Sequence, residues 1–231
     1  MPTLLITGAN RGIGLELTKR YAADGWTVIA ACREPQSATT LKAIRGVSVE
    51  ALDVTDYTAV DKLAQTYDGT AIDLLLNNAG IYGHRDGALK VSDFDTYLQV
   101  LQVNSVAPMK LALAFLPHLK AAQNRNKMGG AKIATISSRM GSIAESGGGA
   151  YAYRASKAAI NAGMHNLALD LKSSGISCIT LHPGWVKTDM GGAGADIDVA
   201  TSAAGLKQVI DGLALKDTGK FYNYDGGEIP W

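Results

Sequence analysis

A tyrosine and a lysine stand four positions apart in the segment Tyr153-Arg154-Ala155-Ser156-Lys157. On a helix, this spacing places the two side chains on one face. A phenol with a pKa of about 10 is a poor acid at neutral pH, and an ammonium group beside it stabilises the phenolate and lowers that pKa. Tyr153 and Lys157 are therefore candidates for moving a proton to or from a substrate oxygen. A surface aromatic–lysine pair is the alternative interpretation.

A serine at the end of an apolar run, Ser138, favours the catalytic interpretation of this pair. The carboxyl end of a parallel strand is where a substrate carbonyl would lie. Ser137 competes with Ser138, and alternation along a strand directs only one of the two side chains to the site. Tyr151 competes with Tyr153, but four residues beyond Tyr151 stands Ala155, which carries no charge.

The first apolar run ends in a glycine-rich turn, Thr7-Gly8-Ala9-Asn10-Arg11-Gly12-Ile13-Gly14. Glycine allows a tight turn and a close approach of the backbone to a pyrophosphate. The helix that follows offers free N–H groups and the positive end of its dipole to an anion. A glycine-rich turn without a ligand is the alternative. The strand–turn–helix context favours a dinucleotide site.

The end of the second apolar run, Ala30-Ala31-Cys32-Arg33, indicates which dinucleotide would bind. NAD enzymes of this architecture place an acid there, which accepts hydrogen bonds from the ribose 2′-hydroxyl. Here that acid is missing, and Arg33 presents a planar fork that suits phosphate oxygens. Arg11 is placed to reach the same phosphate from the other side. A solvated loop position is the alternative for Arg33, but the combination favours NADP(H).

Short apolar runs alternate with helix-length amphipathic segments along the chain. Continuous apolar runs are typical of strands that are covered on both faces. This order predicts a single domain over residues 1–231 with a doubly wound, Rossmann-like parallel sheet of about seven strands and helices on both faces. The expected strands are Thr3–Thr7, Thr27–Cys32, Val47–Leu52, Ile72–Leu76, Lys132–Ser137, Ile176–His182 and a run near Lys220–Tyr222. The expected helices are Gly12–Ala23, Ser37–Arg45, Tyr57–Tyr67, Asp93–Asn104, Ala107–Gln123, Tyr151–Ser173 and Asp198–Gly212.

The composition excludes several classes of protein. The 22 Lys and Arg residues nearly balance the 21 Asp and Glu residues, so the formal net charge of +1 predicts no basic surface for nucleic acid or anionic membrane. Two cysteines are too few for a disulfide scaffold, and no HExxH or CxxC spacing predicts a metal site. The N-terminus has neither a basic segment nor a long apolar stretch, so we expect a soluble cytoplasmic protein.

Five segments in order resemble the classical short-chain dehydrogenase/reductase family over essentially the whole chain. They are the glycine-rich turn, Asp53-Val54, Asn77-Asn78-Ala79-Gly80, Tyr153-Arg154-Ala155-Ser156-Lys157 and Pro183-Gly184-Trp185-Val186-Lys187-Thr188. The closing segment Tyr224–Trp231 looks like the C-factor and sniffer-type carbonyl reductase branch. The resemblance implies an NADP(H)-dependent oxidoreductase that transfers hydride to a small aldehyde, ketone or quinone.

The resemblance also implies roles for the candidate catalytic residues. Tyr153 would be the general acid, Lys157 would in addition hold the nicotinamide ribose, and Ser138 rather than Ser137 would orient the carbonyl. Asn104 matches the asparagine that anchors a water for proton relay, although an isolated asparagine in a helix is more typical of a kink. Fifteen positions separate Ser138 from Tyr153, which is longer than the common family pattern and puts the shape of the substrate pocket in question.

A cofactor site follows from the same resemblance. Asp53 and Val54 would contact adenine, and Thr188 with the backbone of Val186 would bind the nicotinamide carboxamide. For Asn77, a structural role at the strand end has equal weight. The implied cofactor-binding residues are Gly8, Asn10, Arg11, Gly12, Ile13, Gly14, Arg33, Asp53, Val54, Asn77, Ala79, Gly80, Tyr153, Lys157, Pro183, Gly184, Val186 and Thr188. The candidates for the substrate wall are Tyr82, Trp185 and Met190, although ordinary packing explains each one individually.

Two expectations concern the whole protein. The expected helices Ala107–Gln123 and Tyr151–Ser173 carry apolar residues on more than one face, and in this family such helices pair across a two-fold axis, which implies a homodimer. A dinucleotide-binding signalling or regulatory protein with slow turnover is the alternative function, because a fold does not determine a function. The apolar residues in question are Leu113, Phe115, Leu116, Ile160, Met164, Leu167 and Leu171.

Overall fold

The structure, a computed structural model, describes residues 1–84, 94–125 and 130–231. In this part of the chain, seven parallel strands form one sheet in the order β3-β2-β1-β4-β5-β6-β7. The direction of strand succession reverses between β1 and β4, and ligands of such sheets bind at the carboxyl ends beside this point. The strands are β1 Thr3–Thr7, β2 Thr27–Cys32, β3 Val47–Ala51, β4 Leu74–Asn77, β5 Lys132–Ile136, β6 Ser177–His182 and β7 Phe221–Asn223.

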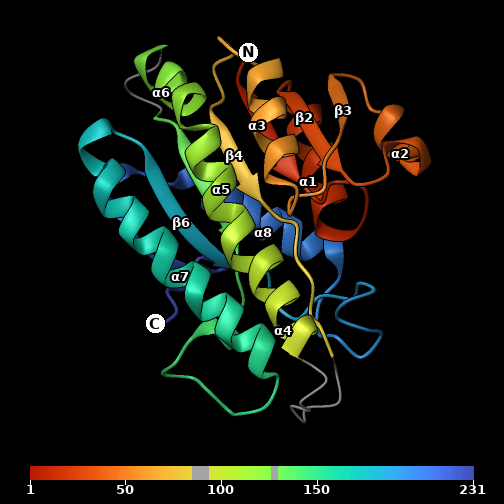
Figure 1. Cartoon of the computed structure of the whole chain (residues 1–231), viewed down its shortest axis with the longest axis vertical. Coiled ribbons are helices and arrows are strands. Elements are labelled where there is room, and N and C mark those ends of the chain that lie inside the picture. The colour runs from red at the N-terminus through yellow and green to blue at the C-terminus, as the bar shows by residue number, and fades with distance from the viewer. Residues whose placement is uncertain (85–93, 126–129) are drawn as a thin grey trace.

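Helices cover both faces of the sheet, which confirms the predicted doubly wound architecture (Figure 1). On one face, Leu5 and Ile133 pack in a core with side chains of α3, α5, α6 and α7. On the other face, Leu4 and Ile6 pack with side chains of α1, α2 and α8. The helices are α1 Gly12–Ala23, α2 Thr39–Lys42, α3 Tyr57–Thr66, α4 Phe94–Leu101, α5 Ala107–Ala114, α6 Leu116–Arg125, α7 Tyr151–Leu171 and α8 Val199–Gly212.

Three of the expected helices differ clearly from the observed ones. The helix expected over Ser37–Arg45 is only the single turn α2, over Thr39–Lys42. The helix expected over Ala107–Gln123 is broken at Phe115, because Pro117 lacks the N–H group that a continuous helix would direct to the carbonyl of Leu113. The helix expected over Asp93–Asn104 ends at Leu101 and continues as a π-helical turn over Gln102–Val106. Asp93 itself lies outside the described residues.

The chain beyond β7 turns back along that strand. Asn223 N donates to Gly227 O at 2.7 Å, and Ile229 N donates to Phe221 O at 2.8 Å. Trp231 then stacks on Phe221, with a ring centroid distance of 5.6 Å. This antiparallel return occupies the outer edge of β7.

No single helix among the described residues is long and apolar enough to cross a membrane. The segments Phe94–Ala114 and Leu116–Arg125, bent by 52°, have the length and composition only as a pair.

Candidate active site and cofactor cradle

The candidate catalytic residues come together at the carboxyl end of β5 and the start of α7. Tyr153 and Lys157 lie in the first turns of α7 and are both buried, and Ser138 lies two residues after the end of β5. The Ser138 hydroxyl hydrogen-bonds the Tyr153 phenol and also accepts from Met140 N at 3.2 Å. A serine hydroxyl from the end of β5 and a phenol from α7 therefore lie together, where both can reach the same substrate oxygen.

The competing residues point elsewhere. The Ser137 hydroxyl donates to Asn161 Oδ1 at 2.6 Å, which turns it into the packing of α7. Tyr151 has 55% of its surface exposed, whereas Tyr153 has 9%. Ser137 therefore points away from Ser138, into the packing of α7, and Tyr151 points to solvent whereas Tyr153 points inward.

Lys157 is held by the backbone at the end of β5. Its Nζ donates to Ile136 O at 2.8 Å and lies 5.6 Å from the centroid of the Tyr153 ring. Burial lowers the pKa of Lys157 to about 8, because the charged ammonium is separated from water. Gly141 makes this packing possible, since a Cβ at that position would stand 2.7 Å from the backbone of Lys157.

The pKa of Tyr153 differs from the expectation that Lys157 lowers it. The pKa of Tyr153 is raised to about 12, mainly by burial; the hydrogen bond from Ser138 lowers it, and the neighbouring Tyr82 adds a smaller rise. The expectation was wrong for the cofactor-free protein because burial acts more strongly on this phenol than any neighbouring charge. The cost of burying a phenolate is therefore the largest effect.

Asn104 lies in the π-helical turn and is buried. Its Nδ2 donates to Ile81 O at 2.8 Å and to Ser156 Oγ at 3.0 Å, and its Oδ1 accepts from Ile81 N at 2.9 Å. Pro108, four residues later, has no N–H to donate to the Asn104 carbonyl as a regular helix residue would. The side chain of Asn104 therefore ties the segment after β4 to α7, and its backbone carbonyl lacks its usual helical donor.

The glycine-rich turn forms a cradle at the start of α1. Gly8 and Gly12 have φ of 65° and 52°, and a Cβ on Gly14 would stand 2.3 Å from Gly8 O. Arg11, the N-cap residue, provides no side-chain cap, and the first turn of α1 has no acidic residue. A pyrophosphate fits this cradle, because anions bind at helix N-termini with uncapped N–H groups.

Asn78 supports the cradle and was not among the expected site residues. Its Nδ2 donates to Thr7 O at 2.9 Å and to Gly8 O at 3.0 Å. The signal in the sequence was the second asparagine of the Asn77-Asn78 pair. For Asn77 the contacts are structural: its Nδ2 donates to Pro108 O at 3.4 Å and to Thr135 Oγ1 at 3.2 Å.

The residues expected at the adenosine end lie at the carboxyl ends of β2 and β3. Asp53 Oδ1 accepts from the backbone and hydroxyl of Thr55, and these bonds, with a smaller effect of Arg33, lower the pKa of Asp53. Arg33 is exposed next to this carboxylate. Arg11 forms an ion pair with Asp189, so the structure places its guanidinium on a carboxylate instead of leaving it free for a phosphate.

The segment after β6 faces the glycine-rich turn. The Cγ2 of Thr188 would lie 3.5 Å from a Cβ on Gly12. Thr188 Oγ1 donates to Val186 O at 3.3 Å, and Val186 pairs with Ile197 in an isolated bridge. Pro183 O accepts from Ser202 Oγ at 2.6 Å. This segment therefore lies against the glycine cradle, on the other side of the candidate cofactor site.

The remaining candidates lie around the same edge. Ala79 N donates to Thr7 Oγ1 at 3.1 Å, and a Cβ on Gly80 would lie 3.2 Å from Asn104 Oδ1. Of the three candidates for the substrate wall, Tyr82 stacks on Tyr153 with a centroid distance of 4.6 Å. The other candidates show these placements: Asn10 is exposed, Ile13 and Gly184 are half-buried, Val54 is buried, and Trp185 and Met190 are exposed.

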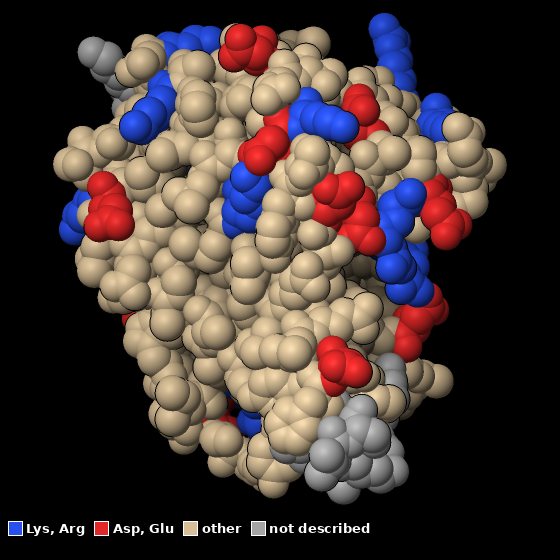
Figure 2. Space-filling model, in the orientation of Figure 1, with Lys and Arg blue, Asp and Glu red and all other residues tan. Residues whose placement is uncertain are grey.

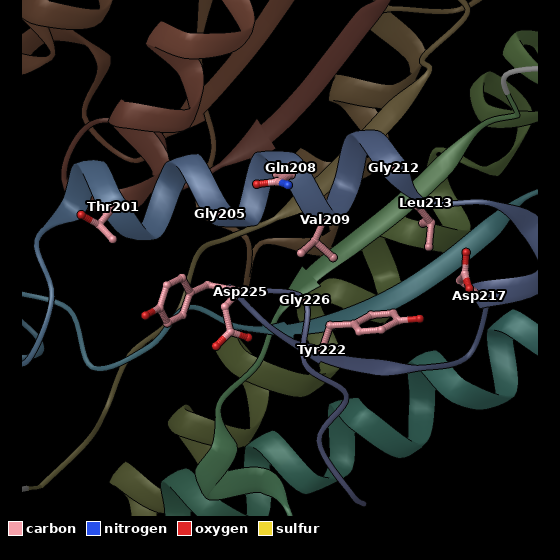
Figure 3. Close-up of a pocket in the computed structure, with 11 residues that line it drawn as sticks. Thr201, Gly205, Gln208, Val209, Gly212, Leu213, Asp217, Tyr222, Asp225 and Gly226 are labelled. Carbon is pink, nitrogen blue, oxygen red and sulfur yellow. The ribbon is translucent and has the colours of Figure 1, made fainter.

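A cavity of about 480 Å³ opens elsewhere, between α8 and the segment after β7 (Figure 3). Val209 of α8 and Leu213 directly after it face Tyr222 and Asp225 across it, and none of the candidate catalytic residues lines it. In the described part of the chain, no group of three His, Cys, Asp or Glu side chains is arranged to hold a metal ion.

The sequence profile of the family described as short chain dehydrogenase matches residues 2–196. C-signal of Myxococcus xanthus is 40% identical over 161 residues, which are 69% of this chain and 93% of C-signal. The structure of the carbonyl reductase Sniffer of D. melanogaster has a TM-score of 0.91 and 38% identity, and the match covers 100% of both chains. The NADPH-bound carbonyl reductase from chicken fatty liver has a TM-score of 0.90 and 35% identity, over 100% of this chain and 99% of that one.

Proposed function

Because the chain belongs to the short-chain dehydrogenase family, as its motifs predicted, we propose that it is an NADPH-dependent reductase of small aldehydes, ketones or quinones. The observation that carries this proposal is the meeting of the Ser138 hydroxyl and the Tyr153 phenol beside the buried Lys157. The glycine cradle faces the same edge of the sheet. Two structural relatives named as carbonyl reductases, one of them NADPH-bound, support this choice of reaction and cofactor.

Each side chain has a distinct part in the proposed reaction. When bound, the reduced nicotinamide supplies a hydride to the carbonyl carbon. Tyr153 donates its phenolic proton to the carbonyl oxygen, and Ser138 orients that oxygen by a hydrogen bond. Lys157 supplies positive charge beside the ring as the phenol becomes a phenolate. The backbone carbonyl of Asn104, which lacks the usual donor four residues later, would hold the water through which the phenolate regains a proton.

The preference for NADPH rests on the end of β2. This strand end has no acidic residue that would repel a 2′-phosphate. Arg33, directly after the strand, is exposed. A guanidinium presents two parallel N–H donors to phosphate oxygens. Asp53 shares this region with Arg33, so the phosphate would replace Asp53 as the stronger partner of the guanidinium.

The proposal is tested with a panel of carbonyl compounds scored by NADPH oxidation, with Tyr153→Phe as the control. The wild type should reduce at least one aldehyde, ketone or quinone. Tyr153→Phe should lose about 10²–10⁴-fold in kcat, because a positioned acid is worth that much, while its Kd for NADPH stays near that of the wild type. Tyr151→Phe should be mild, and the reverse ranking would show that Tyr151 is the acid.

A signalling role with slow turnover is the second candidate, and the observation that favours it is the likeness to the protein named C-signal. The same panel separates the two functions. A signalling protein would bind NADPH with ordinary affinity, yet Tyr153→Phe would leave its biological effect intact. A reductase would lose its effect together with its turnover.

A further inference from the structure

A second tyrosine lies directly on the proposed acid. The ring of Tyr82 stacks on the ring of Tyr153, with centroids 4.6 Å apart and planes 30° from parallel. These values lie within the range of favourable aromatic pairs. Tyr82 comes from the segment after β4, so two elements far apart in the sequence contribute the two phenols.

A network of hydrogen bonds fixes the backbone on both sides of this stack. Asn104 bonds both the N–H and the C=O of Ile81, the residue before Tyr82. The same amide donates to Ser156 Oγ, which in turn donates to Tyr153 O at 2.8 Å. One asparagine therefore connects the backbone next to Tyr82 with the backbone of Tyr153.

The chain also turns sharply just after Tyr82. Gly83 has φ of 83°, and a Cβ there would stand 2.9 Å from Val100 Cγ2 of α4. The position of Tyr82 is thus determined on one side by Asn104 and on the other by a turn that only glycine makes without strain. A side chain between two such constraints has little freedom to leave the stack.

We propose that Tyr82 is a positioning residue for carbonyl reduction: its ring covers one face of Tyr153 and holds the phenol against Ser138. This inference rests on the proposed function, because it assigns Tyr153 the proton transfer. Ser138 acts on the phenol hydroxyl, Lys157 Nζ lies 5.6 Å from the ring centroid, and the ring of Tyr82 stacks on the ring of Tyr153. The substrate oxygen then meets a phenol in one orientation.

Kinetics of Tyr82→Phe and Tyr82→Leu test this role. Tyr82→Phe keeps the stacked ring and should keep kcat near the wild-type value. Tyr82→Leu should lower kcat by about 2- to 12-fold, the range expected for an aromatic pair, with little change in KM or in the Kd for NADPH. Tyr151→Leu is the matched control, since Tyr151 is exposed at the start of the same helix, and it should leave kcat unchanged.

Two kinetic outcomes would overturn the proposal. A rise in KM at constant kcat in Tyr82→Leu would make Tyr82 a substrate contact instead. An equal loss in Tyr82→Phe and Tyr82→Leu would assign the effect to the hydroxyl and not to the stacked ring.

A measurement without substrate separates this proposal from the proposed function. In a double-mutant cycle with Tyr82→Leu and Tyr153→Leu, the unfolding equilibrium constants should show a coupling of about 2- to 12-fold. Additive effects would refute the stack even if the enzyme reduces carbonyls. If the wild type reduces no carbonyl but the coupling is present, the proposed function fails while the stack stands, and the catalytic role assigned to Tyr82 falls with that function.

Discussion

At the scale of single residues, burial decides the protonation of the two groups proposed for proton transfer. It raises the pKa of Tyr153 to about 12 and lowers that of Lys157 to about 8. At neutral pH, Tyr153 is therefore a phenol with a proton to give, which is the state that reduction of a carbonyl requires. Oxidation of an alcohol would need the phenolate, and burial disfavours that form in the cofactor-free protein.

The lowered pKa of Lys157 predicts how the stability of the cofactor-free protein depends on pH. An unfolded lysine, with a pKa of about 10.4, keeps a proton that buried Lys157 loses above a pH of about 8. At this site the unfolded state then binds more protons, so Lys157 contributes a rise in the free energy of unfolding with pH between about 8 and 10. Burial raises the pKa of Cys178 to about 12, and this thiol contributes in the opposite direction. Urea unfolding at closely spaced pH values therefore measures the effect as a difference in slope between the wild type and Lys157→Met. The slope should be less positive in Lys157→Met, and equal slopes would exclude a contribution of Lys157.

Arg33 should act on cofactor affinity and not on the chemical step. Arg33→Ala should raise the KM for NADPH with little change in kcat, because the 2′-phosphate is remote from hydride transfer and its binding is largely uniform. The KM for NADH should stay the same, which makes NADH the internal control. Steady-state kinetics with both cofactors measure the effect. Equal use of NADH and NADPH by the wild type would contradict the assignment.

At the scale of elements, the glycine-rich turn depends on close contacts between backbone atoms. Gly14→Ala would bring a Cβ to 2.3 Å from Gly8 O, so the turn must open. The expected result is loss of NADPH binding, measured by fluorescence titration. Gly212→Ala is the matched control, because a Cβ there meets nothing within 4 Å. Normal NADPH affinity in Gly14→Ala would show that this turn does not hold the cofactor.

Elements with local signals were predictable from the sequence, and those that depend on distant partners were not. Gly12–Ala23 and Thr27–Cys32 have the predicted bounds, because a glycine turn and a continuous apolar run define them locally. The π-helical turn around Asn104 was missed because it combines the local effect of Pro108 with hydrogen bonds to a segment about twenty residues earlier in the chain. Asn78 was missed for the same reason, since its partners lie on β1.

At the scale of the whole molecule, the outer surface of α4, α5 and α7 bears on the oligomeric state. Most apolar residues expected on outer faces are in the core, among them Phe115 and Met164. Leu113 is exposed as expected, together with other large apolar side chains, and this face carries few charges (Figure 2). The exposed large apolar residues are Phe94 and Leu98 of α4, Val106 of the π-helical turn, Leu113 of α5, and Tyr151 and Leu169 of α7.

We propose that this surface pairs with a second copy across a two-fold axis. Light scattering at micromolar concentration should then give the mass of a dimer. Leu98→Glu with Leu113→Glu should give a monomer, because charges in an apolar interface stay desolvated without partners. Lys19→Glu, at an exposed position of α1, is the control for added negative charge. A monomeric wild type would contradict the proposal.

The antiparallel return of residues 227–229 along β7 affects how this sheet meets other chains. A bare edge strand offers a row of unpaired N–H and C=O groups to which another polypeptide can add a strand, and this is a common start of aggregation. Here the return pairs with that edge from within the same chain, and Trp231 packs on Phe221 beyond it. At the opposite edge, β3 instead carries the charged Glu50. The β7 edge is therefore protected by pairing and the β3 edge by charge. Partial unfolding near Trp231 would expose the unpaired N–H and C=O groups of β7, to which another chain can add a strand.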